Sequence, residues 1–242
     1  MNTKFLILSL ICITGYTSVW AQNAVSSRDK QRVKDIIAKL YVNYAEIKTE
    51  DAPIEIKTQT TIIQRKNSEK IEYDTTQSEM TNYVQAGYTM MNDPDGAQIV
   101  MSKDAFITID SDEKTIFLQD PKTEEALHAE TAALRKRTHD LIDSLADSDW
   151  SMDGNLVIIE KNYALTQNAS DAVINHIKFV FDIKEEKIKS QEVDYENYDV
   201  EKVICNYFYT SHPAKKKKTT IDDLTKDSKY TDFIVSDKRT KK

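Results

Sequence analysis

Histidine is the residue type in this chain best suited to bind a metal ion or to transfer a proton. The four histidines are His128, His139, His176 and His212. His128 and His139 fall on one predicted helix but lie eleven residues apart, about 16 Å at 1.5 Å per residue, so they cannot bind the same ion. No pair has the spacing of a helical zinc site, and no cysteine can complete one. We expect solvated or locally hydrogen-bonded histidines and no metal site.

Acidic residues gather in turns whose composition is close to that of a calcium site. Asp93-Pro94-Asp95-Gly96 has the acids and the glycine that begin a calcium-binding loop. Such a loop needs a glutamate at its twelfth position, where Asp104 stands in this chain. A proline turn between two strands explains the segment without a ligand. Asp110, Asp112 and Glu113 likewise indicate a solvated turn.

Nucleophilic chemistry has no recognisable motif in this sequence. Cys205 is the one cysteine beyond the N-terminal segment, and we expect a buried small side chain on a strand rather than a reactive thiol. There is no Gly-x-Ser-x-Gly motif, and glycines are too scarce for a phosphate-binding loop. We therefore predict a non-catalytic protein without a cofactor. A Ser-His-Asp triad or a carboxylate pair assembled by the fold is the open alternative.

The charge balance restricts the class of partner. The formal net charge is −7, which excludes general nucleic-acid binding because that needs a basic surface over the phosphates. The basic residues concentrate near the C-terminus, where they suit an anionic lipid surface or an acidic envelope protein. The alternative is a solvated end of the chain. The concentration consists of Lys215, Lys216, Lys217 and Lys218.

The first 22 residues have the pattern of a cleavable secretory signal peptide. Lys4 supplies the positive charge, and an apolar run of about 15 residues follows from Phe5 to Val19, shorter than the roughly 20 of a membrane-spanning helix. Ala21 is a small residue just before the predicted cleavage point. Cys12 follows Ile11 inside the run, which argues against lipoprotein processing. We predict export to the periplasm of a Gram-negative bacterium.

Hydrophobic periodicity predicts a helix followed by a long antiparallel meander. Val33, Ile36, Ile37 and Leu40 recur at helical spacing after Ser26 or Ser27, either of which can cap the helix. After Pro53 the period changes to two, which predicts strands with one polar face. The strands expected in this part of the chain are residues 54–62, 71–75, 83–91, 98–101, 105–109 and 115–119.

A second helix and a second group of strands complete the pattern. Pro121 opens a helical stretch that we expect to end near 147–150, with an apolar stripe through Leu127, Leu134, Leu141, Ile142 and Leu145. Strands follow at 156–160, 173–183, 188–195 and 203–209. Beyond Pro213 the chain is polar, although 221–234 can hold a short helix or strand. Unbroken runs of strands with few helices predict the α+β class, an antiparallel sheet with helices against one face.

This order of elements resembles the LolA/LolB-like fold of bacterial lipoprotein carriers. The residues that carry the resemblance are the N-terminal helix through Ile36, Ile37 and Leu40, the hairpin 54–75, and the segment 102–121 with its Asp120-Pro121 step into the second helix. The resemblance implies a curved antiparallel half-barrel covered by both helices. It also implies a domain at 23–212, flanked by the signal peptide 1–22 and a lysine-rich tail 213–242.

The resemblance implies a periplasmic carrier for a lipid or a lipoprotein acyl chain, with the second helix as a lid. Face alternation then nominates the residues that would line the cavity. The rival is an envelope interaction protein with a packed core and no cavity, docking through its basic tail. The nominated residues are Ile62, Tyr73, Ile107, Ile109, Leu118, Leu134, Leu141 and Phe179.

Overall fold

The structure is a computed structural model that describes residues 25–67, 72–93, 97–143, 149–163, 173–196 and 199–240. The predicted signal peptide at 1–22 and the Pro94–Gly96 part of the acidic turn lie outside the described residues. Among the described residues, no helix is both long and apolar enough to cross a membrane.

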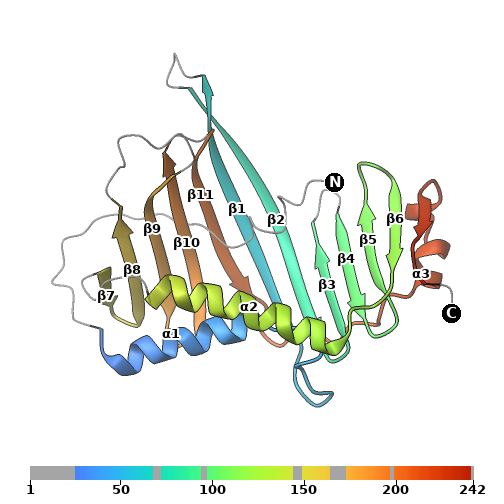
Figure 1. Cartoon of the computed structure of the whole chain (residues 1–242), viewed down its shortest axis with the longest axis horizontal. Coiled ribbons are helices and arrows are strands. Elements are labelled where there is room, and N and C mark those ends of the chain that lie inside the picture. Colours follow the sequence, from blue (N-terminus) through green and yellow to red (C-terminus); the bar gives the residue numbers. More distant parts are fainter. Residues whose placement is uncertain are drawn as a thin grey trace. The chain divides into compact units, whose positions relative to one another are not determined.

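The fold belongs to the α+β class, as the periodicity predicts. Its twelve strands hydrogen-bond in the order β12-β6-β5-β4-β3-β2-β1-β11-β10-β9-β8-β7. Consecutive strands therefore lie side by side over most of the sheet, which is the arrangement of antiparallel meanders (Figure 1). The short strand β12 differs, since it pairs parallel to β6. Chain contacts divide the protein into two compact units, which are described separately.

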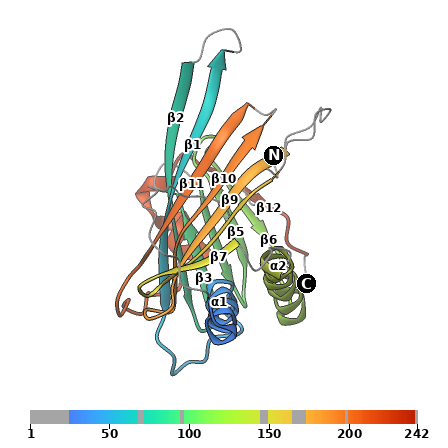
Figure 2. The ribbon, with the colours of Figure 1, turned by 90° about the vertical axis from the view of Figure 1, so that its left-hand side faces the viewer.

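Unit 1 joins the first helix to the strands of the second half of the chain. Ser26 caps helix α1 by accepting a hydrogen bond from the Asp29 amide, and Val33, Ile36 and Ile37 form its buried stripe. Figure 2 shows α1 beside the strands of this unit. The unit contains α1 (Ser27–Leu40), β7 (Trp150–Asp153), β8 (Leu156–Asn162), β9 (Val173–Asp182), β10 (Lys187–Glu196) and residues 200–208 of β11 (Val200–Tyr209), with residues 58–67 of β1 (Ile54–Asn67) and 72–78 of β2 (Glu72–Gln85).

Unit 2 holds the first meander together with the C-terminal segment. The predicted short helix or strand within 221–234 is confirmed and comprises both, because a helix and a 3-10 turn precede β12. Thr220 and Asp223 form a capping box that starts the helix. The unit contains β3 (Tyr88–Asn92), β4 (Gln98–Ser102), β5 (Phe106–Asp110), β6 (Thr115–Gln119), α3 (Ile221–Lys226), the 3-10 turn (Ser228–Tyr230) and β12 (Ile234–Asp237), with residues 124–134 of α2 (Glu124–Asp143).

Two apolar clusters fill unit 2. Leu224 of α3 packs on the larger one, to which the strands contribute alternate residues, so that Ile107 lies opposite Leu118. The smaller cluster brings Tyr44 and Leu127 against Val84. The larger cluster consists of Tyr83, Tyr88, Met90, Val100, Ala105, Ile107, Ile109, Ile116, Leu118 and Leu224.

Several element boundaries differ from the prediction. The stretch 83–91 is two strands, because the chain turns at Gly87, whose φ of +68° favours glycine. Trp150 was expected at the end of the second helix. It begins β7 instead, and its side chain is buried. The first hairpin is longer than predicted, with β1 continuing to Asn67.

Candidate functional sites

A cluster of charged side chains occupies one face of strands β8 to β11 in unit 1. His176 of β9 lies directly opposite Asp194 of β10, and Glu192 lies opposite Lys178. Because residues two apart on a strand point to the same side of the sheet, these four side chains share a face. Glu160 of β8 joins them opposite Lys178. Antiparallel register therefore gathers residues that are up to 34 positions apart in the sequence.

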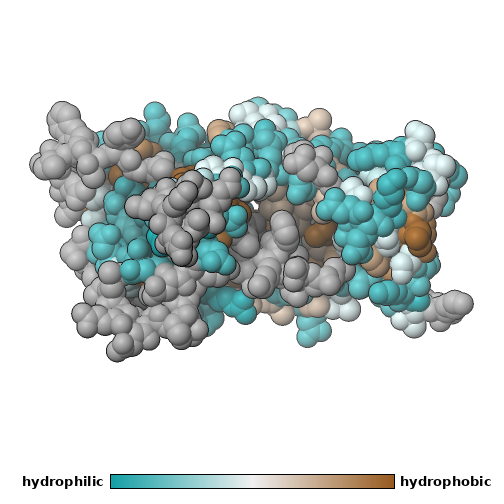
Figure 3. All heavy atoms as spheres, turned by 90° about the horizontal axis from the view of Figure 1, so that it is seen from above, coloured by the Kyte–Doolittle hydropathy of each residue, from teal (hydrophilic) through white to brown (hydrophobic). Residues whose placement is uncertain are grey.

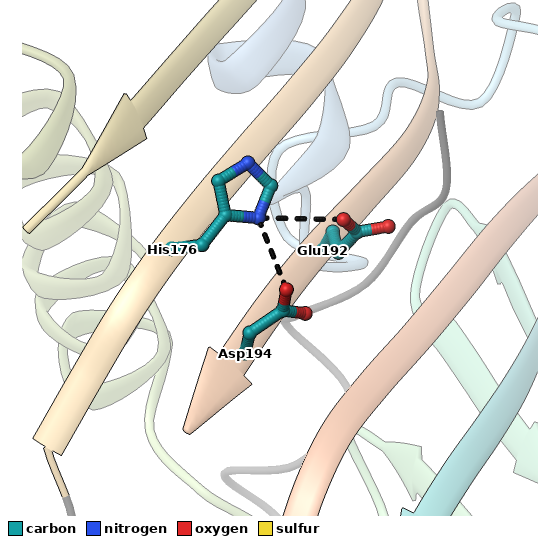
Figure 4. A group of neighbouring side chains, drawn as sticks. All are labelled: His176, Glu192 and Asp194. Atoms are coloured by element: carbon teal, nitrogen blue, oxygen red, sulfur yellow. Dashed lines mark ion pairs between the residues drawn. The ribbon is translucent and has the colours of Figure 1, made fainter. Parts of the chain in front are cut away.

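The distances show a connected network around the imidazole of His176. Its Nε2 is hydrogen-bonded to a Glu160 carboxylate oxygen at 3.1 Å. Its Nδ1 lies 3.3 Å from Glu192 Oε1 and 3.4 Å from Asp194 Oδ2. Figure 4 shows Glu192 and Asp194 converging on that nitrogen from the neighbouring strand. Lys178 pairs with Glu160 at 2.8 Å.

The network keeps His176 protonated in neutral solution. The carboxylates of Asp194 and Glu192 favour the imidazolium form and raise the pKa of His176 to about 10, although burial of the ring opposes the shift. Lys202 pairs with Asp194 at 3.0 Å and with Glu192 at 3.2 Å. A proton held this firmly does not transfer near pH 7, so His176 is not placed to act as a general base there.

A pocket opens beside this cluster. Its volume is about 440 Å³, and it is lined by Asn162, Tyr163, Asn175, His176 and Asp194. Amide, phenol, imidazole and carboxylate groups in one lining suit a polar ligand rather than an acyl chain. Among the described residues, His176, Glu192 and Asp194 form a group that could hold a metal ion, with donor atoms within 4.8 Å of one another.

Three of the predicted cavity residues of unit 2 belong to its packed core. Ile107, Ile109 and Leu118 are each at most 2% exposed and pack together with Leu224 of α3. Their side chains therefore fill the interior between the strands and the C-terminal segment. The second pocket on this unit has a volume of about 450 Å³ and a mostly charged lining of Lys103, Asp104, Asp120, Pro121, Asp237, Arg239 and Thr240.

The nominated residues of unit 1 are not gathered at one site. Phe179 is 2% exposed and stacks on Phe181 with ring centroids 6.1 Å apart. Tyr73 is 45% exposed, and its hydroxyl donates to Glu201 at 3.4 Å. Ile62 and Leu141 are half-buried.

Helix α2 buries polar residues and exposes one of its leucines. Thr131 is 7% and Thr138 is 6% exposed, whereas Leu134, between them in the sequence, is 41% exposed. Leu127, at the start of the predicted stripe, is buried. Leu134 lies on the same side of the helix as Thr131 and Thr138 and is nevertheless exposed, which a sequence pattern of apolar spacing alone could not reveal.

Hydrogen bonds add to apolar packing in both halves of α2. In unit 1, the Arg135 guanidinium donates to the backbone carbonyls of Ala38 and Tyr41 at the end of α1. The Thr138 hydroxyl donates to the Tyr41 hydroxyl at 3.2 Å. In unit 2, the Asn43 amide donates to Thr131 at 2.9 Å. These polar partners explain why Thr131 and Thr138 occupy the buried side.

The predicted basic docking residues make contacts within unit 2. Lys215 donates to the Thr49 carbonyl at 2.7 Å. Lys216 pairs with Glu55 at 2.5 Å and lies 4.3 Å above the Tyr83 ring. Lys217 pairs with Asp223 at 2.6 Å and keeps 80% of its side chain exposed. The Lys218 ammonium lies close to Gly87.

The surface of the C-terminal segment is mixed in character. The coloured surface in Figure 3 is largely hydrophilic, with a small hydrophobic patch toward the side of the view where α3 and β6 lie. The two apolar residues of β12 are exposed, Ile234 at 70% and Val235 at 44%. The segment thus combines exposed lysines with a short apolar strand at the end of the strand order.

Comparisons with protein-family models and with curated protein sequences give no match to this chain. Its residues and their geometry are therefore the basis of the functional proposals below.

Proposed function

We propose that this protein is a non-catalytic carrier that binds the acyl chain of a lipid or lipoprotein through helix α2. The observation that supports the proposal is the exposed Leu134 in the middle of a helix whose buried side holds Thr131 and Thr138. A helix that served only to cover a core would turn its leucines inward and its threonines outward. Leu127 and Ile142 of this helix do turn inward, whereas Leu134 is 41% exposed and offers an apolar contact for a ligand.

Leu134 lies on the part of α2 that belongs to unit 2, and it is 41% exposed there. Each leucine that a bound acyl chain covers contributes about 1.5–3 kcal/mol to binding. Hydrogen bonds of Arg135 and Asn43 hold the helix in place. In this proposal α2 is the lid, and the protein acts in the periplasm after export.

A carrier of this kind needs no covalent chemistry. Its affinity comes from the apolar area removed from water, less the cost of ordering the ligand. The charged network around His176 and its polar pocket do not contribute to acyl binding. That network is a separate feature of unit 1.

An envelope interaction protein is the second candidate. The exposed Ile234 and Val235 of β12 favour it, because an uncovered apolar edge strand can pair with a strand of another protein. The exposed Lys217 adds positive charge on the same C-terminal segment. A partner would then dock on unit 2 without any acyl ligand.

Binding of a fluorescent phospholipid to the purified chain distinguishes the two candidates. Leu134→Asp should weaken binding at least tenfold, because a charge replaces a leucine in contact with the acyl chain. Ala132→Asp is the matched control, since Ala132 is also exposed but points about 160° away around the helix. Equal affinities for these two variants would contradict the assignment of α2 as the lipid-contacting lid.

A further inference from the structure

We propose that His176, Glu192 and Asp194 form a binding site for a divalent transition metal ion of the Zn²⁺ class. His176 Nδ1 is 3.3 Å from Glu192 Oε1 and 3.4 Å from Asp194 Oδ2. A tetrahedral Zn²⁺ ion with bonds of about 2.0–2.2 Å holds its ligand atoms about 3.4 Å apart. The two separations from Nδ1 therefore already match those that the ion requires, and one donor atom from each of the three residues lies within 4.8 Å of the others.

Two atoms of the cluster lack the hydrogen bonds expected of buried polar groups. Glu192 is 4% exposed, and its Oε2 has no hydrogen-bond partner. His176 Nδ1 is buried and makes no hydrogen bond despite its closeness to both carboxylates. A buried polar atom without a partner is costly, and such atoms call for an explanation such as an ion. A metal ion at the centre of the cluster would displace the imidazole proton and coordinate both residues.

The surroundings of His176 match those of metal-binding imidazoles. A metal-bound histidine usually gives its other ring nitrogen to a carboxylate, which fixes the ring. Here Nε2 is hydrogen-bonded to Glu160 at 3.1 Å, and Lys178 holds Glu160 at 2.8 Å. Nδ1 is consequently the nitrogen turned toward Glu192 and Asp194.

The ion would have space for a further ligand. The pocket of about 440 Å³ reaches His176 and Asp194 and continues to Asn162, Tyr163 and Asn175. Asn175 Oδ1 also lacks a hydrogen-bond partner. Three protein ligands with an open side can leave a position for water or a small polar ligand.

The lysine beside the cluster does not occupy every carboxylate oxygen. Lys202 contacts Asp194 through Oδ1 and Glu192 through Oε1. Asp194 Oδ2 faces the imidazole, and Glu192 Oε2 has no hydrogen-bond partner. One imidazole nitrogen and two carboxylate oxygens form a donor set that Zn²⁺ accepts readily.

Calorimetric titration of the chelator-treated full chain with ZnCl₂ tests this inference. We expect one Zn²⁺ ion per chain, with His176→Gln and Asp194→Asn each weakening binding at least 100-fold. Glu160→Gln should weaken it by about 10–100-fold through the orientation of the ring. His128→Gln is the matched control, because His128 lies 3.8 Å from Glu46 but on an exposed surface, and its affinity should equal that of the parent.

Circular dichroism of each variant separates loss of the site from loss of the fold. Absorption spectra of the Co²⁺-loaded parent provide a second readout, which should show metal-ligand bands that His176→Gln removes. An absence of Zn²⁺ binding by the parent would overturn the inference. Equal Zn²⁺ affinity for the parent and a folded His176→Gln or Asp194→Asn variant would do the same. The titration contains no lipid, so its outcome is independent of the proposed carrier function.

Discussion

The two units of this protein use their strands in different ways. In unit 2, residues of alternate positions such as Ile107 and Leu118 pack under α3 and make a dry apolar core. In unit 1, Phe179 and Ile177 are buried, whereas their neighbours His176 and Lys178 join a network of ion pairs on the other face. The strands of both units alternate with period two, but β9 of unit 1 alternates between apolar and charged residues. The contrast indicates that unit 2 is built for stability, while unit 1 also maintains charged groups at a cost in desolvation.

The largest effect should come from the apolar core of unit 2. Leu224→Ala removes a side chain that is 4% exposed within the main cluster, so we expect a loss of about 2–5 kcal/mol in the free energy of unfolding. Urea denaturation measures it.

Leu134→Ala provides the comparison for that core substitution. Leu134 is 41% exposed, and its replacement should change stability by less than about 0.5 kcal/mol. A similar loss for both variants would mean that Leu134 supports the fold rather than a ligand.

Arg135 should have the next largest effect, through the end of helix α1. Arg135→Met removes two charge-assisted hydrogen bonds to the carbonyls of Ala38 and Tyr41, which should cost about 1.5–3 kcal/mol. The neighbouring Arg137 is exposed, and Arg137→Met should change the melting temperature little. Comparable melting temperatures for the two variants would contradict the anchoring role of Arg135.

The charged face of unit 1 should give stability a dependence on pH. The pKa of His176 is raised to about 10 in the folded protein from its usual 6.5. Its protonation therefore stabilises the fold fully below about pH 6.5, and this contribution is lost as the pH rises through 10. The stability difference between the parent and His176→Gln should shrink from pH 6 to pH 10, measured by urea denaturation. A difference that grows over this range would show that the network does not favour the imidazolium.

The carboxylates of the same network should make the stability of the fold depend on pH in the acidic range. Lys178 and His176 lower the pKa of Glu160 against the opposing effect of burial, and His176 and Lys202 do the same for Asp194. Their contribution to stability is fully present above the ordinary carboxylate pKa. It is lost as the pH falls from there through the lowered pKa of the folded protein. Unit 1 should therefore lose stability in acid as well as in alkali.

The smallest effect is expected from the lysines of the C-terminal segment. Lys216 holds Glu55 in its ionised form and lowers the pKa of that carboxyl group, and it also covers the Tyr83 ring. Lys216→Met should cost about 1 kcal/mol, whereas Lys217→Met, at an exposed pair, should cost less than about 0.5 kcal/mol. Thermal unfolding compares them, and the reverse order would contradict the structural role of Lys216.

Periodicity predicted the α+β class and most strands because local alternation records which face is buried. The strand at Thr115–Gln119 was predicted with the boundaries that the structure has. Of the stripe predicted for helix α2, Leu127 and Ile142 are buried but Leu134 is exposed. Thr131 and Thr138 are buried as well, because they hydrogen-bond to Asn43 and Tyr41. Spacing of leucines carries no information about those partners.

The cluster around His176 was missed because its residues are neighbours only through strand register. The predicted strands at 173–183 and 188–195 contained a usable signal, since pairing them as a hairpin places His176 close to Asp194. A register shift between Ile188 and Ser190 moves the pairing by one residue. Sequence reasoning could therefore identify the hairpin but could not decide which side chains meet.

Native mass spectrometry of the protein, purified from the envelope fraction without detergent, tests the central claim most directly. The carrier proposal predicts a population with the added mass of a lipid or an acylated peptide, which Leu134→Asp loses and Ala132→Asp retains. A bare protein mass that stays unchanged after incubation with lipids and lipopeptides would contradict the claim and favour an interaction protein that docks through β12.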